Sequence, residues 1–265
     1  PKIPVAAARA GFTPQQAREL RARYTYEEAI SAGDVSLFHF LNLGIWLPTA
    51  PVVREGDVVP LATAADPRVG QTRISAGGTT LADYLASAGS RAQGMVVVHR
   101  GRIVFEDYPG MRPFDHHVWM STAKTTTSLV VRLLAEAGRI DVARPIEGYL
   151  PALRGTDWAG TSVLDVLDMA SGMDIVETQA NRQKPRSAIT RYNLAAGGEP
   201  NADGRKGELF EVVRSARRLR PAGEAFEYSS MNTTLLVLLA EAVENKRWHE
   251  IFQERVWAKM TAEGD

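Results

Sequence analysis

The chain has 265 residues, which suits one large domain or two small ones, and its 31 basic residues balance 31 acidic ones. This balance gives no indication of a nucleic-acid or anionic-membrane partner. Cysteine is absent and the histidines form no metal-ligand pair, which excludes disulfides and thiolate catalysis and leads us to expect no metal and no cofactor.

The first predicted elements are helices on either side of an irregular stretch. Residues 13–24 read as a short helix, with Thr13 as the N-cap and Pro14 at the first helical position. Residues 42–80 are rich in proline and glycine, and we interpret them as an irregular surface segment. The stretch 79–89 predicts a second helix that ends at a glycine.

A β-hairpin is predicted next. Residues 95–108, "MVVVHRGRIVFEDY", contain two β-rich runs around a turn in which Gly101 supplies the backbone freedom. Two strands are not stable alone, so we expect more strands than this stretch supplies.

The second half predicts mainly helices. One begins near Ser121 and closes at Gly138, and another covers 161–172. Residues 177–208 are the least apolar stretch and read as a long loop or lid, with Ile189 and Tyr192 as possible anchors. Further helices are predicted at 209–219, 233–245 and 249–260. This mixed order favours an α+β fold.

The segment "MSTAK" places Ser121 three residues before Lys124, at the start of an apolar helix. Positions i and i+3 share a helix face, so the two side chains can approach each other. A serine hydroxyl becomes a good nucleophile when a base takes its proton. Burial and the positive helix terminus both favour a neutral lysine amine, so we expect a buried first turn here. The alternative is that Ser121 is an ordinary N-cap.

A second set of candidates lies in "PAGEAFEYSSMN". Tyr228 could accept the serine proton or return it to a leaving group. Ser230 and Asn232 follow at alternate positions, so in an extended segment they would share the face of Tyr228 and contact substrate. The alternative is that Tyr228 is a core residue and Asn232 caps the next helix.

At these residues the chain resembles the serine β-lactamase and penicillin-recognising hydrolase superfamily, in its class C-like branch. "MSTAK" resembles that family's Ser-x-x-Lys motif, "LDVLDMASGM" its helix ending in Ser-Gly, and "PAGEAFEYSSMN" its tyrosine segment. The closest likeness is to 6-aminohexanoate-dimer hydrolases and related esterases. The resemblance runs from about residue 95 to the end, and more weakly upstream.

The resemblance implies roles for particular residues. Ser121 would be the acylated nucleophile, and its backbone N–H would form half of the oxyanion hole. Lys124 would accept the serine proton or tune Tyr228, which would act as general base and acid. Ser230, Asn232 and Ser171, the serine of the Ser-Gly motif, are the substrate-binding candidates.

The implied fold is β-lactamase-like, with an antiparallel sheet flanked by helices and an all-helical region. We expect residues 1–94 to form an N-terminal extension with the first helices. Residues 95–265 would be the N-terminal portion of the catalytic region, with a helical subdomain at about 140–245. The family's third motif and the C-terminal strands are absent, so we expect a further C-terminal portion or a second polypeptide to complete the fold.

The expected function is hydrolysis of a small ester or amide, and two alternatives stay open. One is a β-lactamase or D,D-peptidase, which Ser230 disfavours because many relatives carry asparagine there and a hydroxyl cannot replace an amide. The other is a catalytically inactive binding relative or half of a split enzyme.

Two further expectations concern the other histidines and the location. His116 or His117 with Asp115 or Asp107 would form a Ser-His-Asp triad, but Lys124 already occupies the position of the base. No apolar run reaches transmembrane length, so we expect a soluble protein without a membrane partner, in either the cytoplasm or the periplasm.

Overall fold

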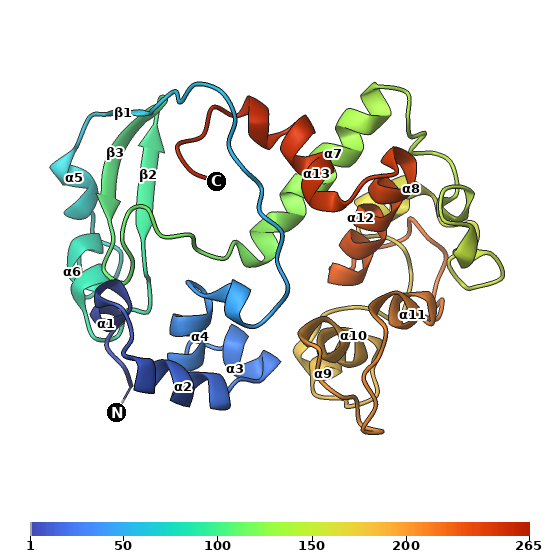
Figure 1. Cartoon of the computed structure of the whole chain (residues 1–265), viewed down its shortest axis with the longest axis horizontal. Coiled ribbons are helices and arrows are strands. Elements are labelled where there is room, and N and C mark those ends of the chain that lie inside the picture. The colour runs from blue at the N-terminus through green and yellow to red at the C-terminus, as the bar shows by residue number, and fades with distance from the viewer. Residues whose placement is uncertain (1) are drawn as a thin grey trace. The chain divides into compact units, whose positions relative to one another are not determined.

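The structure, a computed structural model, describes residues 2–265 (Figure 1). The contacts within it divide the chain into two units. The first runs through Thr49 and resumes over Val58–Val118, and the second comprises Ala50–Asp57 and Trp119–Glu263. The main division therefore follows Val118, whereas our expected boundary follows residue 94. The hairpin belongs with the N-terminal helices because its neighbours in space are the short helices that precede it.

The described part of the first unit contains six short helices. They are α1 (Val5–Ala10), α2 (Pro14–Ala22), α3 (Tyr26–Ile30), α4 (Asp34–His39), α5 (Pro67–Gly70) and α6 (Leu81–Ala86). The start of α2 is as predicted, because the Thr13 side chain accepts a hydrogen bond from the backbone N–H of Gln16. A small core of Leu20, Ala29, Val35 and Phe38 holds α2, α3 and α4 together.

The sheet of the first unit has three strands in the order β1-β3-β2. The predicted hairpin is confirmed as β2 (Met95–His99) and β3 (Arg102–Asp107), which pair antiparallel. Both turn residues, Arg100 and Gly101, have positive φ, as a two-residue hairpin turn requires. The short strand β1 (Ala62–Thr63) pairs parallel to β3, so the sheet is mixed rather than purely antiparallel.

The second unit is helical. Its helices are α7 (Lys124–Glu136), α8 (Val163–Leu167), α9 (Gln179–Arg182), α10 (Ala188–Gly197), α11 (Leu209–Arg214), α12 (Ser230–Glu244) and α13 (Trp248–Arg255). The long helix α12 contacts α7, α8 and α13 and forms the centre of the unit. A small sheet and a helical region in one chain confirm the α+β class.

The stretch 177–208 differs from the predicted loop, because it contains α9 and α10. Ser187 caps α10 by accepting from the Thr190 N–H, and Ile189 is fully buried. The hydroxyls of Tyr192 and Thr234 lie 2.7 Å apart and join α10 to α12. Both predicted anchors therefore hold a helix. The prediction failed because α10 is only ten residues long and lies in a stretch that is otherwise rich in polar residues and glycine, which hides its periodic signal.

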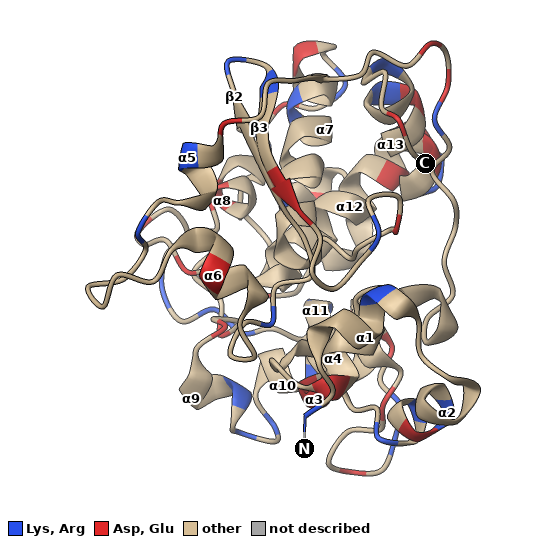
Figure 2. Ribbon diagram, turned by 90° about the vertical axis from the view of Figure 1, so that its left-hand side faces the viewer, with Lys and Arg blue, Asp and Glu red and all other residues tan. Residues whose placement is uncertain are grey.

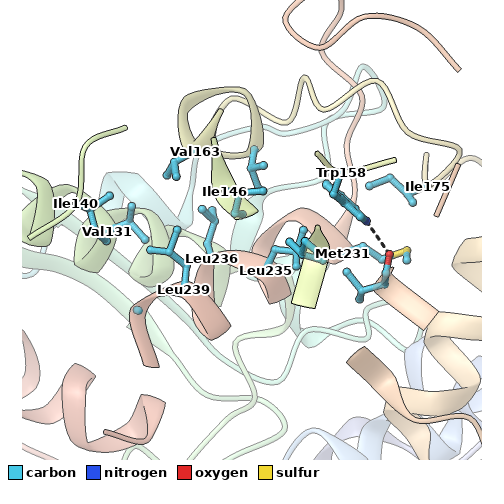
Figure 3. Packing of buried hydrophobic residues seen from close by; sticks show 14 of the residues in the cluster. Val131, Ile140, Ile146, Trp158, Val163, Ile175, Met231, Leu235, Leu236 and Leu239 are labelled. Carbon is cyan, nitrogen blue, oxygen red and sulfur yellow. Dashed lines mark hydrogen bonds between the residues drawn. The ribbon is translucent and has the colours of Figure 1, made fainter. Parts of the chain in front are cut away.

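A large apolar core aligns the helices of the second unit (Figure 3). Trp158 is fully buried, and its indole N–H donates a 2.8 Å hydrogen bond to the backbone carbonyl of Val213. Leu235 and Leu239 on α12 and Val131 on α7 belong to the same core. This packing fixes α7 beside α12, and so fixes the segments that lead into both helices.

Charged residues of both signs occur along the helices and loops of both units (Figure 2). Within residues 2–265, no helix combines the length and apolar character needed to cross a membrane.

Candidate active site

The nucleophile candidate lies in a tight turn that continues directly into α7. Residues Met120–Ala123 form a 3-10 turn, and the α-helix begins at Lys124. The Lys124 amine donates a 2.9 Å hydrogen bond to the hydroxyl oxygen of Ser121, so the predicted contact is present. Met120, immediately before the serine, has φ of 48°, a conformation that is costly for a residue with a side chain.

The first turn of α7 is not buried as expected. Ser121 is exposed and Lys124 is half-buried, and the buried face of the helix begins at Thr127. The buried residues of α7 lie further along the helix. Among the described residues, the start of the helix therefore lies outside the apolar core. The serine is therefore accessible to a substrate, while its lysine is partly shielded from water.

Tyr228 lies beside this pair. The amine of Lys124 is 5.3 Å from the centroid of the Tyr228 ring, within the range of a cation–π contact. Tyr228 is half-buried and immediately precedes the start of α12. The structure therefore brings together three residues that the sequence singled out separately, from two segments about a hundred positions apart.

The Ser-Gly motif supports the segment that leads to Tyr228. The carbonyl of Met169 accepts from the Glu227 N–H at 2.7 Å, and the carbonyl of Gly172 accepts from the Leu219 N–H at 2.8 Å. Gly172 has φ of 72°, and a Cβ there would lie 2.3 Å from the carbonyl oxygen of Arg220. Only glycine allows this close approach of two backbones.

Ser171 belongs to this supporting turn. Its side chain is buried, and its backbone carbonyl accepts a 3.4 Å hydrogen bond from the Arg218 guanidinium. The hydrogen bonds described for residues 2–265 do not join Ser171 to Ser121, Lys124 or Tyr228. Its substrate-binding role stays a prediction.

The segment after Tyr228 is helical rather than extended. Ser229 is the N-cap of α12, and its hydroxyl accepts from the Met231 N–H, so Asn232 is not the cap. Because the helix begins at Ser230, the expected alternation of Ser230 and Asn232 on one face is wrong. Ser230 is half-buried at the helix start.

Asn232 lies inside the helical unit with 1% of its surface exposed. Neither its amide nitrogen nor its amide oxygen has a hydrogen-bond partner among the described residues. A buried amide without partners is unfavourable, which sets Asn232 apart from the surrounding apolar residues. The hydrogen bonds described for residues 2–265 do not join it to Tyr228, and its role as a substrate contact stays a prediction.

Sequence reasoning missed Glu177. Its backbone N–H donates a 3.0 Å hydrogen bond to the carbonyl of Tyr228, and its carboxylate accepts a 2.5 Å hydrogen bond from the Ser230 N–H. Glu177 opens the stretch that the composition assigned to a loop, and no local pattern marks it. The signal is a contact between residues 53 positions apart, which the fold alone creates.

Two of the four side chains named for the Ser-His-Asp alternative, His117 and Asp115, have other partners. The two ring nitrogens of His117 lie 2.9 Å from the Val118 carbonyl and 3.2 Å from the Gln93 amide oxygen. Asp115 forms a two-oxygen pair with Arg112, whose hydrogen bonds hold the pKa of the Asp115 carboxyl below its ordinary value. These contacts explain the two side chains as structural groups of the first unit.

Among residues 2–265, no three His, Cys, Asp or Glu side chains gather in a way that could hold a metal ion.

Comparison with known proteins supports the family resemblance and the fold. The Beta-lactamase family model matches residues 79–263. Over 228 residues the chain is 35% identical to the 6-aminohexanoate-dimer hydrolase of Paenarthrobacter ureafaciens, covering 85% of this chain and 55% of that protein. A structure from Bacillus anthracis, provisionally named a 6-aminohexanoate-dimer hydrolase, superposes with a TM-score of 0.76 at 20% identity. That match covers 87% of this chain and 60% of the other, so the chain spans less than two thirds of either relative.

Proposed function

The chain belongs to the Beta-lactamase family, and from this premise we propose that it is a serine hydrolase that forms an acyl-enzyme on Ser121. The observation that carries the proposal is the 2.9 Å contact between Ser121 and Lys124, with the Tyr228 ring 5.3 Å from the same amine. A nucleophile, a base and a second proton carrier within one site are what acyl transfer through serine requires.

In the acylation step, the hydroxyl oxygen of Ser121 attacks the carbonyl carbon of the substrate. Its proton passes to the neutral Lys124 amine or to the Tyr228 phenolate, and then to the departing alcohol or amine. The backbone N–H of Ser121 would stabilise the negative charge that develops on the carbonyl oxygen. Water then attacks the ester carbon and releases the acid, and Ser121 regains its proton.

The substrate class that we propose is a small ester or a linear amide. The curated relative is named for a 6-aminohexanoate dimer, which is a linear amide, and that name is the basis for including amides. Ser121 is exposed, which supports access by an extended chain.

A fluorophosphonate probe tests the nucleophile directly. We expect mass spectrometry to find the probe on the peptide that contains Ser121, and no labelling in Ser121→Ala. Labelling of Ser121→Ala at the wild-type rate, or none of the wild type, would contradict the proposal. The second result would favour the inactive binding relative.

Turnover of two chromogenic substrates separates the two hydrolase classes. We expect the wild type to hydrolyse p-nitrophenyl acetate faster than nitrocefin. Ser230 supports this order, because it stands where a β-lactam-hydrolysing relative would offer an amide. Faster nitrocefin turnover would instead favour the β-lactamase alternative.

A further inference from the structure

The carboxylate of Glu177 bridges the backbone beside Tyr228 and a guanidinium. One oxygen accepts a 2.5 Å hydrogen bond from the Ser230 N–H, and the other accepts a 2.7 Å hydrogen bond from Arg182. The Glu177 N–H donates to the Tyr228 carbonyl at 3.0 Å. Glu177 therefore holds the main chain at Tyr228 and again two residues later.

We infer that Glu177 is a positioning residue for Tyr228, and that its carboxylate fixes the phenol relative to Lys124. This inference rests on the proposed function, because it assigns Tyr228 a proton to carry. Glu177 itself has no role in the chemistry: both of its carboxylate oxygens are engaged, and only 5% of its side chain is exposed.

The bridge is strong for three physical reasons. The first N–H groups of a helix have no partner within the helix, and Glu177 satisfies that of Ser230. A negative charge at the start of the fifteen-residue helix α12 also interacts favourably with the helix dipole. Burial from water strengthens both contacts, and Arg182 balances the charge that burial would otherwise penalise.

A loose start of α12 would move the phenol. Both backbone groups that Glu177 holds lie on the C-terminal side of the Tyr228 Cα. The Glu227 N–H, which donates a 2.7 Å hydrogen bond to the Met169 carbonyl, holds the chain on the other side, so losing Glu177 frees one of the two sides. Proton transfer requires donor and acceptor within hydrogen-bond reach, and a displacement of about 1 Å can cost about a hundredfold in rate. The carboxylate bridge is therefore expected to act on the rate of the chemical step.

Glu227 provides a matched control. It is the immediate neighbour of Tyr228 and is also a carboxylate paired with an arginine, at 2.8 Å from Arg220. Its side chain makes no hydrogen bond to the backbone of residues 228–230 in the described structure. Glu227→Gln therefore removes a carboxylate next to Tyr228 and leaves the Glu177 contacts with Ser230 and Arg182 in place.

The kinetic test compares Glu177→Ala, Glu177→Gln and Glu227→Gln with the wild-type chain on p-nitrophenyl acetate. We expect Glu177→Ala to lower kcat by about tenfold to a hundredfold while KM changes by less than about twofold. Glu177→Gln should be intermediate, because its amide has one acceptor oxygen where the carboxylate has two. Glu227→Gln should remain within about threefold of the wild type.

A spectroscopic test does not depend on activity. In protein with ring-labelled 13C-tyrosine, the Tyr228 signal is assigned by its absence in Tyr228→Phe. We expect one sharp Tyr228 signal in the wild type and in Glu227→Gln, and a shifted or broadened signal in Glu177→Ala and Glu177→Gln.

The outcomes separate the two proposals. An unchanged Tyr228 signal in both Glu177 variants overturns the inference. Three kinetic results also overturn it. They are a kcat of Glu177→Ala within threefold of the wild type, a change in Glu177→Ala confined to KM, and a loss of kcat in Glu227→Gln equal to that in Glu177→Ala. If the wild type shows neither Ser121 labelling nor turnover, the hydrolase proposal fails, and the Tyr228 signal still decides whether Glu177 positions that ring. If Glu177→Ala does not fold, the same kinetic and spectroscopic comparisons are made with Glu177→Gln.

Discussion

The Lys124 amine lies 2.9 Å from the hydroxyl oxygen of Ser121, one helical turn earlier in the chain. The contact is local, since both residues belong to the same turn and need no other element to bring them together. When the amine is neutral, this distance allows the hydroxyl to donate its proton to nitrogen.

Replacing Lys124 with methionine tests that contact. We expect Lys124→Met to lower the rate of Ser121 labelling by about a hundredfold or more, because general base catalysis contributes about 10²–10⁴ in rate. The half-buried side chain is replaced by one of similar length, so the unfolding midpoint should change little. Lys246→Met removes a lysine that pairs with Glu254 at the surface, and it should label at the wild-type rate.

Replacing Tyr228 with phenylalanine separates the phenol from the ring. The ring stays beside the Lys124 amine, so the cation–π contact is retained while the proton carrier is lost. We expect kcat to fall by about a hundredfold or more and folding to be preserved. The control is Tyr84→Phe, which alters an exposed tyrosine in the first unit and should leave kcat unchanged. Full activity in Tyr228→Phe would remove this residue from the mechanism.

Alanine substitutions at two glycines measure how much the close approach at Gly172 contributes to the free energy of unfolding. Gly172 and Gly155 both have φ of 72°, but only at Gly172 would a Cβ meet the Arg220 backbone, at 2.3 Å. Gly155→Ala should cost about 1 kcal/mol in the free energy of unfolding, which is the cost of the conformation alone. Gly172→Ala should cost about 2–4 kcal/mol, because a backbone must also move. Urea unfolding of both variants gives the difference, and equal losses would show that the close approach is not maintained.

Features with strong local signals could be predicted from the sequence. The cap at Thr13, the hairpin around Gly101 and the contact of Ser121 with Lys124 each depend on residues within a few positions of one another. Tyr228 was singled out from the residue types of its segment, and the resemblance to a family motif supported it. Its position beside Lys124 follows from the packing of α12 on α7.

Features that depend on distant contacts could not be predicted. Helix α10 is stabilised by a buried isoleucine and a hydroxyl contact to α12, and the polar residues, prolines and glycines on either side of it resemble a loop. The predicted start of α12 at residue 233 was wrong because Ser229, Ser230 and Asn232 are all acceptable N-cap residues. Glu177 is linked to Ser230 across 53 positions, and no periodic pattern records that link.

The stability of the first unit should depend on pH through His39. This side chain is buried beside the rings of Tyr24, Trp46 and Phe40, and its Nδ1 atom has no hydrogen-bond partner among the described residues. Burial lowers the pKa of His39 from its ordinary value of 6.5, because an apolar environment disfavours the charged imidazole.

The sign of the effect follows from proton uptake. Below pH 6.5, His39 takes up a proton in the unfolded chain but stays mostly neutral in the folded chain, because its pKa there is lower. The unfolded state therefore binds more protons. The free energy of unfolding therefore falls as the pH drops from 6.5 toward the lowered pKa. In His39→Phe, urea midpoints at about pH 7.5 and about pH 5.5 should differ less than in the wild type, because this titration is gone. His99→Phe, at an exposed strand end, should keep the wild-type difference, and an undiminished difference in His39→Phe would show that another group causes it.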